Sequence, residues 1–321
     1  MELRPLGNTG IQVSAIALGC WPIAGMSSPG VNDADSLATI RACFDLGINH
    51  LDTAYCYARH GESERLIARA LGGRRREMVI ATKGGLHWAP DGGPQVCDAA
   101  PATLRRECEE SLRRLETDHV DLLYLHAPDP KVPVAESAGA LRRLLEEGKT
   151  LSVGASNLTL PTLQQFVAEC PLAAYQPPYN MLLRRIEADI LPWCRRNHVA
   201  VLVYWPLMKG LLAGKLGRDH VFGPDDNRRK YPMYQGEEYR KNLDLVEKLA
   251  AIAGQSGRTV GELVLNWTIH QPGVTSALCG AKRRQQIAEN ARGAGWQLTP
   301  QQRAAIDQAL AERGPTAYEL P

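Results

Sequence analysis

The chain has 321 residues, 44% of them hydrophobic, so it is long and apolar enough to bury a substantial core. Its 37 basic and 35 acidic side chains leave a net charge of +2, which gives no electrostatic reason to expect nucleic acid or an acidic membrane as a partner. The sequence begins MELRPLGNTG, which lacks the basic and apolar regions of a signal peptide, and the longest apolar strand-like run, residues 199–208, is too short to cross a bilayer.

The eight cysteines lie at positions 20, 43, 56, 97, 108, 170, 194 and 279, and none forms a CxxC pair. In a chain of this length, the pattern is typical of reduced thiols in the cytoplasm rather than of a disulfide framework. The eight histidines are scattered as well, so we expect no metal site.

The first predicted element is a β-hairpin in the segment LRPLGNTGIQVS, residues 3–14. Two short strand-like pieces flank residues 7–10, whose sequence GNTG is a turn signal of the hairpin type. Because the hairpin precedes the repeating part of the chain, we expect it to act as a plug.

After the hairpin, apolar strand-like runs alternate with amphipathic helical runs. We predict strands at residues 16–18, 48–52, 78–82, 120–126, 151–156, 173–177, 199–204 and 275–279. We predict helices at residues 34–46, 101–115, 137–147, 161–170, 187–196, 239–256 and 259–270, and a last helix that opens at residues 299–300. Residues 206–236 are rich in Gly, Pro, Asp and Arg, and their length without periodicity is typical of a functional loop.

Eight strand–helix units with mostly continuous apolar strands predict an α/β fold: a (β/α)8 TIM barrel with an N-terminal β-hairpin and extra C-terminal helices. The alternative is a doubly wound open sheet, but the turn after the first strand, LGCWPIAG, is not the GxGxxG fingerprint of that fold. Length alone suggests two domains, yet barrels often reach this length as one. We therefore predict a single domain that spans residues 1–321.

Polar side chains stand at the ends of the predicted strands, where a barrel of this kind has its active site. Asp52 ends the second strand and Tyr57 lies in the loop after it, while Lys83 ends the third strand and His126 the fourth. Each residue alone has an ordinary explanation: a capping acid, a core phenol, a solvated lysine or a satisfied core histidine. Their convergence on one rim from three adjacent strands favours a proton-transfer site.

The chemistry of such a set is specific. A phenol titrates near pH ~10, and a lysine ammonium beside it is expected to lower the pKa of Tyr57, while Asp52 would hold that lysine in place. A nearby histidine can donate a hydrogen bond to a carbonyl oxygen. The set could protonate a developing alkoxide, or deprotonate an alcohol in reverse, but a nicotinamide cofactor would have to supply or accept the hydride.

Other residues on the rim suit that cofactor. Ser156, Asn157 and Gln176 offer hydroxyl and amide groups to a carboxamide, and Tyr204 offers a ring for stacking. In GAKRRQQIAEN, the basic residues 282–284 lie between a strand end and a helix N-terminus, where a phosphate is favoured. They indicate a 2′-phosphate, and hence NADPH rather than NADH; the alternative is an ordinary solvated helix start.

The segments NHLDTAYCY, ATKGG, DLLYLHAPDP, VGASN, QPPYN, YWPLMKGLLAGK and GAKRRQQIAEN together give the sequence a resemblance to the aldo-keto reductase family. They occur in the family's order and cover nearly the whole chain. The phrase DDNRRKYPMYQGEEYRKNL is similar to the bacterial stress-protein and sugar-reductase branch. The resemblance implies a (β/α)8 barrel that binds NADPH in an extended pose and reversibly reduces a sugar, aliphatic or aromatic aldehyde or ketone.

The resemblance also implies roles for individual residues. The catalytic tetrad would be Asp52, Tyr57, Lys83 and His126, with Tyr57 as general acid. The cofactor would be held by Ser156, Asn157, Gln176, Tyr204, Leu207, Gly210, Lys215, Gly280, Lys282, Arg283, Gln286 and Asn290. The substrate pocket would be lined by Trp21, Trp88, Ala127 and Trp205, although the first two tryptophans could equally be core residues.

The sequence departs from the family pattern close to the predicted site. Ala58 follows the predicted catalytic tyrosine where the family often has glycine, Trp205 interrupts a common YSPL motif, and Ala127 stands where other branches have an aromatic residue. We expect these departures to affect which substrate is bound, and not the assignment of the catalytic tetrad.

Two other functions remain open: an NADPH-binding regulatory or scaffold subunit of the same fold, and a metal-free barrel lyase that uses Lys83 as a Schiff base. If the protein is the carbonyl reductase that the resemblance implies, we expect its partner to be a small-molecule carbonyl substrate. The mostly polar surface pattern indicates a monomer or a weak homo-oligomer.

Overall fold

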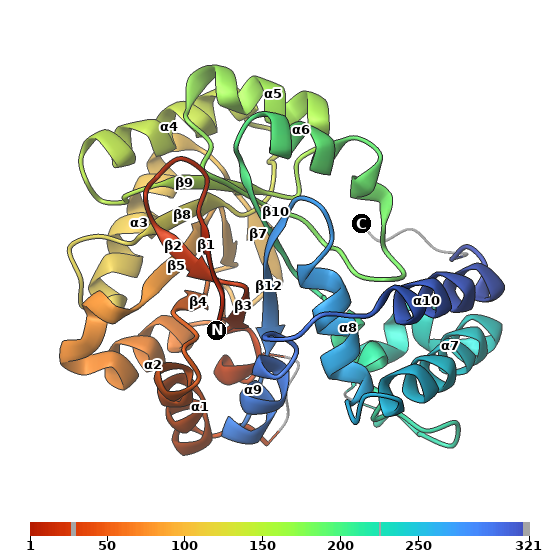
Figure 1. Ribbon diagram of the computed structural model, residues 1–321. Helices are drawn as coiled ribbons and strands as arrows, with labels where there is room; N and C mark the ends of the chain where they lie inside the picture. The colour runs from red at the N-terminus through yellow and green to blue at the C-terminus, as the bar shows by residue number, and fades with distance from the viewer. Residues whose placement is uncertain (27–29, 225, 317–321) are drawn as a thin grey trace.

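The computed structural model describes residues 1–26, 30–224 and 226–316. Its centre is a closed barrel of parallel strands surrounded by helices (Figure 1). In the order in which neighbours pair around the barrel, the strands are β3 (Ile16–Gly19), β4 (His50–Asp52), β5 (Val79–Gly84), β8 (Leu122–Leu125), β9 (Val153–Ser156), β10 (Ala174–Gln176), β11 (Ala200–Val203) and β12 (Val274–Gly280). The predicted (β/α)8 TIM barrel is confirmed.

Helices cover the outside of the barrel. They are α1 (Asp33–Asp45), α2 (Glu62–Leu71), α3 (Pro101–Leu115), α4 (Val134–Glu146), α5 (Leu160–Glu169), α6 (Ile190–Arg196), α7 (Gly236–Gly254), α8 (Val260–Ile269), α9 (Arg284–Ala291) and α10 (Pro300–Arg313). Figure 1 shows α7 and α10 side by side at one edge of the molecule, where they pack against each other outside the ring of barrel helices. They are the helices additional to the barrel. Of the two, α10 follows the last barrel strand, as predicted, whereas α7 precedes that strand.

The N-terminal hairpin closes the barrel at the amino ends of its strands. Its strands β1 (Leu3–Pro5) and β2 (Gln12–Ser14) pair antiparallel, as predicted. Leu6 and Val13 are fully buried in the same apolar cluster as Tyr124 and Leu122 of the barrel interior. Gly7 has a φ of +56°, and a Cβ there would lie 2.7 Å from the carbonyl oxygen of Ala173, so the turn needs glycine to lie this close to the barrel.

The predicted strands all form, and most predicted helices differ from the observed ones only at their ends. The helix predicted from residue 187 begins at Ile190, after a 3-10 turn at Arg185–Glu187. The prediction had no counterpart for α2 or for a second hairpin of β6 (Leu86–Trp88) and β7 (Gln95–Cys97), nor for the 3-10 helices at Pro22–Ala24 and Gly72–Glu77. Among its described residues, the predicted loop at 206–236 forms short 3-10 helices at Met208–Ala213, Asn227–Lys230 and Pro232–Tyr234, and its last residue, Gly236, begins α7.

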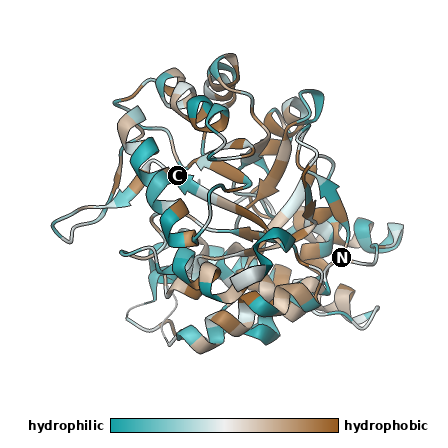
Figure 2. Ribbon diagram, turned by 90° about the vertical axis from the view of Figure 1, so that its left-hand side faces the viewer, coloured by the Kyte–Doolittle hydropathy of each residue, from teal (hydrophilic) through white to brown (hydrophobic). Residues whose placement is uncertain are grey.

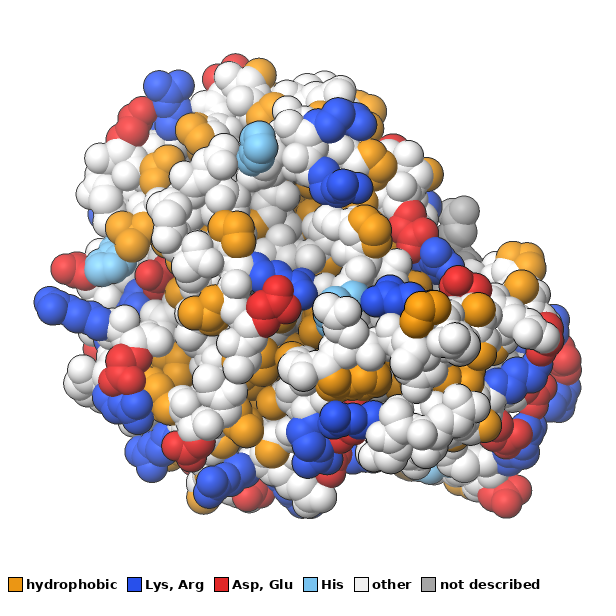
Figure 3. All heavy atoms as spheres, in the orientation of Figure 1, with side chains coloured by type: hydrophobic (Ala, Val, Ile, Leu, Met, Phe, Trp, Pro, Cys, Tyr) orange, Lys and Arg blue, Asp and Glu red, His pale blue; other side chains and the backbone are white. Residues whose placement is uncertain are grey.

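The hydrophobic side chains form two layers, one between strands and helices and one inside the barrel. Figure 2 shows hydrophobic colour along the strands and hydrophilic colour on the outer sides of the helices. Acidic and basic side chains are interspersed over the face seen in Figure 3, without a large patch of one sign. Among the described residues, no helix combines the length and apolar character needed to cross a membrane.

His50 occupies the barrel interior below the rim. Side chains alternate along a strand, so His50 faces the same way as Asp52, two residues on. The ring is fully buried, and neither of its nitrogens has a hydrogen-bonding partner among the described residues. Burial, opposed in part by the charge of Asp52, lowers the pKa of His50 to about 4. The ring is therefore neutral at physiological pH.

We predict that His50→Phe flattens the loss of stability in acid. Below pH 6.5, the ordinary pKa of histidine, His50 is protonated in the unfolded chain. In the folded protein it stays neutral until about pH 4. Stability therefore falls as the pH drops through this window, by up to about 1.4 kcal/mol per pH unit from this one group. Urea unfolding at pH 7, 6, 5 and 4 measures the slope. The exposed His60→Asn serves as control, and equal slopes in all three proteins would contradict the prediction.

Candidate active site

The alternation of side chains along the strands brings the predicted rim residues together. Val79, Ala81 and Lys83 of β5 face the barrel interior by this rule, as does Asp52 at the end of β4. The backbone register pairs Asp52 with Ala81, and Lys83 lies two residues beyond Ala81 on β5. The side chains of Asp52 and Lys83 are therefore neighbours on adjacent strands. Both are almost fully buried.

Lys83 is the centre of the polar contacts on this rim. Its Nζ lies 2.6 Å from Oδ1 of Asp52, 2.7 Å from the carbonyl oxygen of Thr53 and 3.4 Å from the hydroxyl of Tyr57. The other carboxylate oxygen of Asp52 accepts a bond of 2.7 Å from Nε2 of Gln176. A buried charge is tolerated only when it is paired and hydrogen-bonded, and both members of this pair meet that condition.

The loop after β4 folds Tyr57 back over the rim. The Tyr55 amide donates to the carbonyl of Lys83, and the indole Nε1 of Trp88 donates to the carbonyl of Cys56 at 2.9 Å. Ala58 then turns the chain with a φ of +66°, a left-handed conformation that favours glycine. The family's common glycine at this position thus has a conformational reason, and this chain adopts the same turn with alanine.

The expected lowering of the Tyr57 pKa is wrong for this arrangement. Burial raises the pKa of the phenol well above its ordinary value, and the negative charge of Asp52 raises it further. Because Asp52 pairs closely with Lys83, the ammonium cannot act on the phenol as an isolated positive charge. Tyr57 is therefore held as the protonated phenol, which is a donor rather than a preformed phenolate.

His126 follows β8 and lies beside Tyr57. The two ring centroids are 6.2 Å apart, and the amide of His126 donates to the carbonyl of Gly84. Desolvation in the site, together with the positive charge of Lys83, lowers the pKa of His126 to about 3. The imidazole is thus neutral near pH 7, with one ring nitrogen able to donate and the other able to accept.

The residues expected to bind a carboxamide, here called the polar row, form two separate hydrogen-bonded chains that both reach the tetrad. In the first, the hydroxyl of Ser156 donates to the carbonyl oxygen of Gln176 at 2.7 Å, and the Gln176 side chain donates to Asp52. In the second, the Tyr204 hydroxyl donates to Asn157 Oδ1 at 2.8 Å, and Asn157 Nδ2 donates to the carbonyl oxygen of His126 at 3.0 Å.

The segment predicted for a phosphate lies between β12 and α9. The Lys282 amide donates to Oε1 of Gln286, and Asn290 Nδ2 reaches the carbonyl oxygen of Gly280 at 3.5 Å. Arg283 is exposed, with only a loose 3.9 Å pair to Asp35. Arg284 pairs with Asp45 at 3.5 Å, so both arginines approach acidic side chains of α1. Arg284 makes the closer pair, and Arg283 keeps the looser one.

The loop after β11 comes close to this segment. Lys215 forms an ion pair with Glu289 of α9, and Leu207 and Gly210 lie in the 3-10 turn just after β11. Sequence reasoning missed Arg228 in the same loop, which is close enough to Lys282 to lower the pKa of that lysine in addition to burial. It also missed Lys209, whose Nζ lies 4.5 Å from the Trp205 ring centroid and 4.6 Å from that of Tyr231.

The predicted pocket residues have different surroundings. Trp21 meets Tyr57 edge-on with centroids 5.1 Å apart, so it lies at the site. Trp88 braces the catalytic loop through Cys56, and the guanidinium of Arg59 stacks on its ring at 4.4 Å. Trp205 packs edge-on against Tyr204 with a φ of +58°. Ala127 follows His126 and is half-buried.

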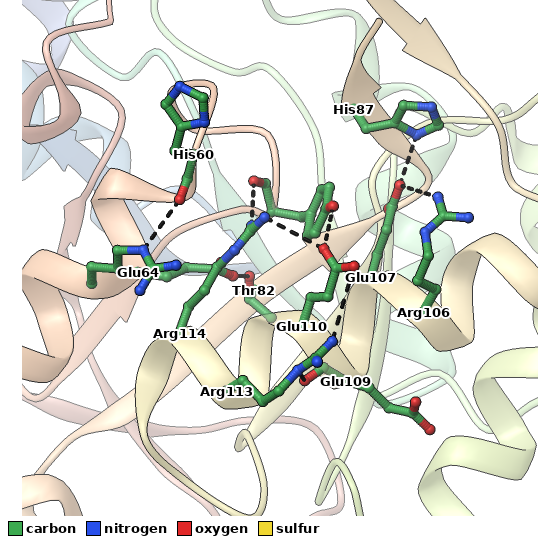
Figure 4. A network of polar contacts seen from close by, with 12 residues as sticks. His60, Glu64, Thr82, His87, Arg106, Glu107, Glu109, Glu110, Arg113 and Arg114 are labelled. Atoms are coloured by element: carbon green, nitrogen blue, oxygen red, sulfur yellow. Dashed lines mark hydrogen bonds and ion pairs between the residues drawn. The ribbon is translucent and has the colours of Figure 1, made fainter. Parts of the chain in front are cut away.

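An acidic layer behind the rim supports this arrangement (Figure 4). Glu107 of α3 accepts from the Gly85 amide at 2.7 Å and from Nδ1 of His87 at 2.8 Å. Arg114, also of α3, donates to the carbonyl of Tyr55 and pairs with Glu64 of α2. These contacts fix the backbone on either side of Lys83 and Tyr57. An open cavity of about 400 Å³ lies on this outer side of the catalytic loop and is lined in part by Arg59, Trp88 and Arg106.

The chain is similar to known proteins over nearly its whole length. The family model described as the aldo/keto reductase family matches residues 15–311. The curated Aldo-keto reductase YhdN of Bacillus subtilis (strain 168) is 36% identical over 313 residues, which are 97% of this chain and 94% of that protein. Aldo-keto reductase yakc of Schizosaccharomyces pombe, whose name specifies NADP(+), is 32% identical over 292 residues, covering 89% of this chain and 85% of its own.

Two solved structures have the same architecture. The glycerol dehydrogenase AKR11B4 from Gluconobacter oxydans has a TM-score of 0.91 and 36% sequence identity, covering 99% of this chain and 98% of its own. The aldo-keto reductase AKR11C1 from Bacillus halodurans, in its holo form, has a TM-score of 0.82 and 26% identity, with the same coverage of both chains.

We predict that Asp52→Asn destabilises the fold by about 3 kcal/mol, because it leaves the Lys83 ammonium buried without its charged partner. Asp52→Asn combined with Lys83→Met removes both charges and should be more stable than the single variant. Urea unfolding followed by far-UV circular dichroism measures both free energies. A single variant within 1 kcal/mol of wild type would show that the pair is not a constraint on folding.

Proposed function

Since this chain belongs to the aldo/keto reductase family, and is therefore an oxidoreductase, we propose that it reduces an aldehyde or ketone to the alcohol with NADPH, using Tyr57 as the general acid. The observation that carries the proposal is the position of the Lys83 ammonium, which contacts both the Asp52 carboxylate and the Tyr57 hydroxyl in a buried site. The reaction is reversible in principle, because the same groups can take up the proton.

Each member of the tetrad has a defined task in this proposal. NADPH, when bound, supplies a hydride to the carbonyl carbon. The Tyr57 hydroxyl gives its proton to the oxygen, and Lys83 stabilises the phenolate that remains. Neutral His126 donates a hydrogen bond to the carbonyl oxygen, and Asp52 holds Lys83 in place. The high pKa of Tyr57 is compatible with carbonyl reduction. The alkoxide that develops on the substrate is a far stronger base than a phenolate, so it accepts the proton of the Tyr57 hydroxyl.

The residues present fit a nicotinamide cofactor with a phosphorylated ribose. Lys282 and Arg283 stand at the N-terminus of α9. Burial and the charges of Arg228 and Arg283 lower the pKa of Lys282, although Asp226, which pairs with Arg228 at 2.6 Å, acts in the opposite direction. An anion bound beside Lys282 and Arg283 would be stabilised by both charges. We assign the pyrophosphate to the loop that holds Leu207, Gly210 and Lys215, the last of which pairs with Glu289 of α9. The name of the Schizosaccharomyces pombe relative, which specifies NADP(+), supports this choice.

Gln176, Ser156, Asn157 and Tyr204 lie between the tetrad and the phosphate segment, which suits the nicotinamide end. We assign the carboxamide to the polar row and the ring face to Tyr204. For the substrate, Trp21 provides an aromatic wall at Tyr57, and we assign Trp88, Ala127 and Trp205 to the outer part of the pocket. Such walls suit the faces of small polyols and sugars as well as aromatic aldehydes, and a solved relative is named a glycerol dehydrogenase.

The contacts of Lys83 argue against the lyase hypothesis. A Schiff base requires a neutral amine, whereas this Nζ donates to a carboxylate and a carbonyl at 2.6 and 2.7 Å, which favours the ammonium. A regulatory subunit would require the cofactor site but not the tetrad. The direct contacts of Lys83 with Asp52 and Tyr57 favour catalysis over that alternative.

We predict that Tyr57→Phe lowers the reduction rate by at least about a thousandfold, because the proton donor is lost, while the dissociation constant for NADPH changes less than threefold. Steady-state kinetics on a panel of aldehydes, ketoses and keto-acids, together with NADPH titration by tryptophan fluorescence, provide the two readouts. Tyr55→Phe is the matched control, since its hydroxyl bonds to Glu110 outside the barrel. Full activity of Tyr57→Phe would rule out the assigned acid.

We also predict that Lys282→Ala with Arg283→Ala weakens NADPH binding about a hundredfold, while NADH binding changes less than about threefold, since charge-assisted phosphate contacts contribute about 1.5–3 kcal/mol each. Fluorescence titration with both cofactors measures the effect. Arg284→Ala, which removes the same charge from a residue paired with Asp45, should alter neither affinity. Equal losses for the two cofactors would remove the case for a 2′-phosphate.

A further inference from the structure

His126 is held on several sides, and its ring has one direct side-chain contact that the proposed mechanism does not use. Its backbone amide bonds to Gly84, and its carbonyl accepts from Asn157 at 3.0 Å. The ring nitrogen Nδ1 lies 3.6 Å from Sγ of Cys56, the residue just before Tyr57. This contact joins the catalytic loop after β4 to the end of β8.

We propose that Cys56 is a positioning residue: its thiol donates a hydrogen bond to Nδ1 of His126, so that the ring proton stays on Nε2 and is available to the substrate oxygen. A neutral imidazole carries its proton on either nitrogen, and the hydrogen bond at one nitrogen decides which. The inference rests on the proposed function, in which His126 donates to the carbonyl oxygen of the substrate.

The direction of the bond follows from the state of both groups. Burial raises the pKa of the Cys56 thiol to about 12, so the sulfur carries its proton, and the pKa of about 3 keeps His126 neutral. An imidazole nitrogen is a good acceptor, whereas a thiol sulfur is a weak one. Cys20, Cys43 and Cys279, also buried, direct their thiols as donors to backbone carbonyl oxygens. At Cys56 the acceptor is a ring nitrogen instead.

The opposite direction would oppose the chemistry. If Nδ1 carried the proton and donated to sulfur, Nε2 would be left with a lone pair facing the site. Two acceptors, Nε2 and a carbonyl oxygen, cannot form a hydrogen bond. A thiol proton at Nδ1 therefore selects the tautomer that polarises the substrate.

The thiol is itself held in position. Cys56 is 1% exposed, and its carbonyl accepts from Trp88 Nε1 at 2.9 Å and from Gln95 Nε2 at 3.4 Å. Both donors belong to the β6–β7 hairpin. The hairpin thus places the sulfur against His126, and the contact needs no further ordering when substrate arrives.

The test uses the full chain labelled with ¹⁵N at histidine. Two-bond proton–nitrogen spectra distinguish a protonated ring nitrogen from an unprotonated one, and the His126 signals are identified by their loss in His126→Gln. We expect wild type to show protonated Nε2 and unprotonated Nδ1. Cys56→Ala should show a mixture of tautomers, Cys56→Ser should restore the wild-type pattern through its hydroxyl, and Cys43→Ala is the control for loss of a buried thiol distant from the ring.

Kinetics give the second readout. We expect Cys56→Ala to lower kcat about tenfold with KM nearly unchanged, the effect of one modest hydrogen bond, and Cys56→Ser to recover most of it. A wild-type ring protonated on Nδ1, or Cys56→Ala with an unchanged tautomer, would overturn the inference. The spectra require neither cofactor nor substrate, so a fixed Nε2–H tautomer in a protein that reduces no carbonyl would instead contradict the proposed function.

Discussion

The buried ion pair between Lys83 and Asp52 is the constraint on which the rest of the site depends. A charge inside a barrel must be matched, and the match here uses both carboxylate oxygens, one backbone carbonyl and the amide of Gln176. Once these bonds form, the lysine has no freedom to move relative to β4, β5 or β10. Tyr57 is then placed against a fixed ammonium, and His126 against a fixed phenol.

Charged side chains behind the rim support the backbone on either side of this pair. Glu107 and Arg114 of α3 bond to the backbone at Gly85 and Tyr55, which lie two residues from Lys83 and Tyr57. A helix on the outside of the barrel therefore controls the position of groups inside it. Polar groups between strand and helix are costly unless satisfied, and here the same bonds that satisfy them also orient the site.

The sequence predicted those parts of the molecule that follow from periodicity and strand ends. The barrel follows from strand-like runs that alternate with helical runs, and the hairpin follows from the turn signal at residues 7–10. The contact of Asp52 with Lys83 follows from their positions at the ends of neighbouring strands. The sequence could not predict the shift of the Tyr57 pKa, because the competition between burial and two opposite charges depends on distances. Nor could it assign Arg284 to α1 or Arg228 to the phosphate segment, since both depend on how an aperiodic loop and a helix start pack.

The N-terminal hairpin gives the molecule a further property. Leu6 and Val13 are fully buried in one apolar cluster with side chains of the barrel interior, such as Leu122 and Tyr124. Packed side chains therefore close this end of the barrel to water and ions. Groups at the rim exchange protons with solvent at the carboxyl ends of the strands, so the amino end contributes stability without taking part in that exchange.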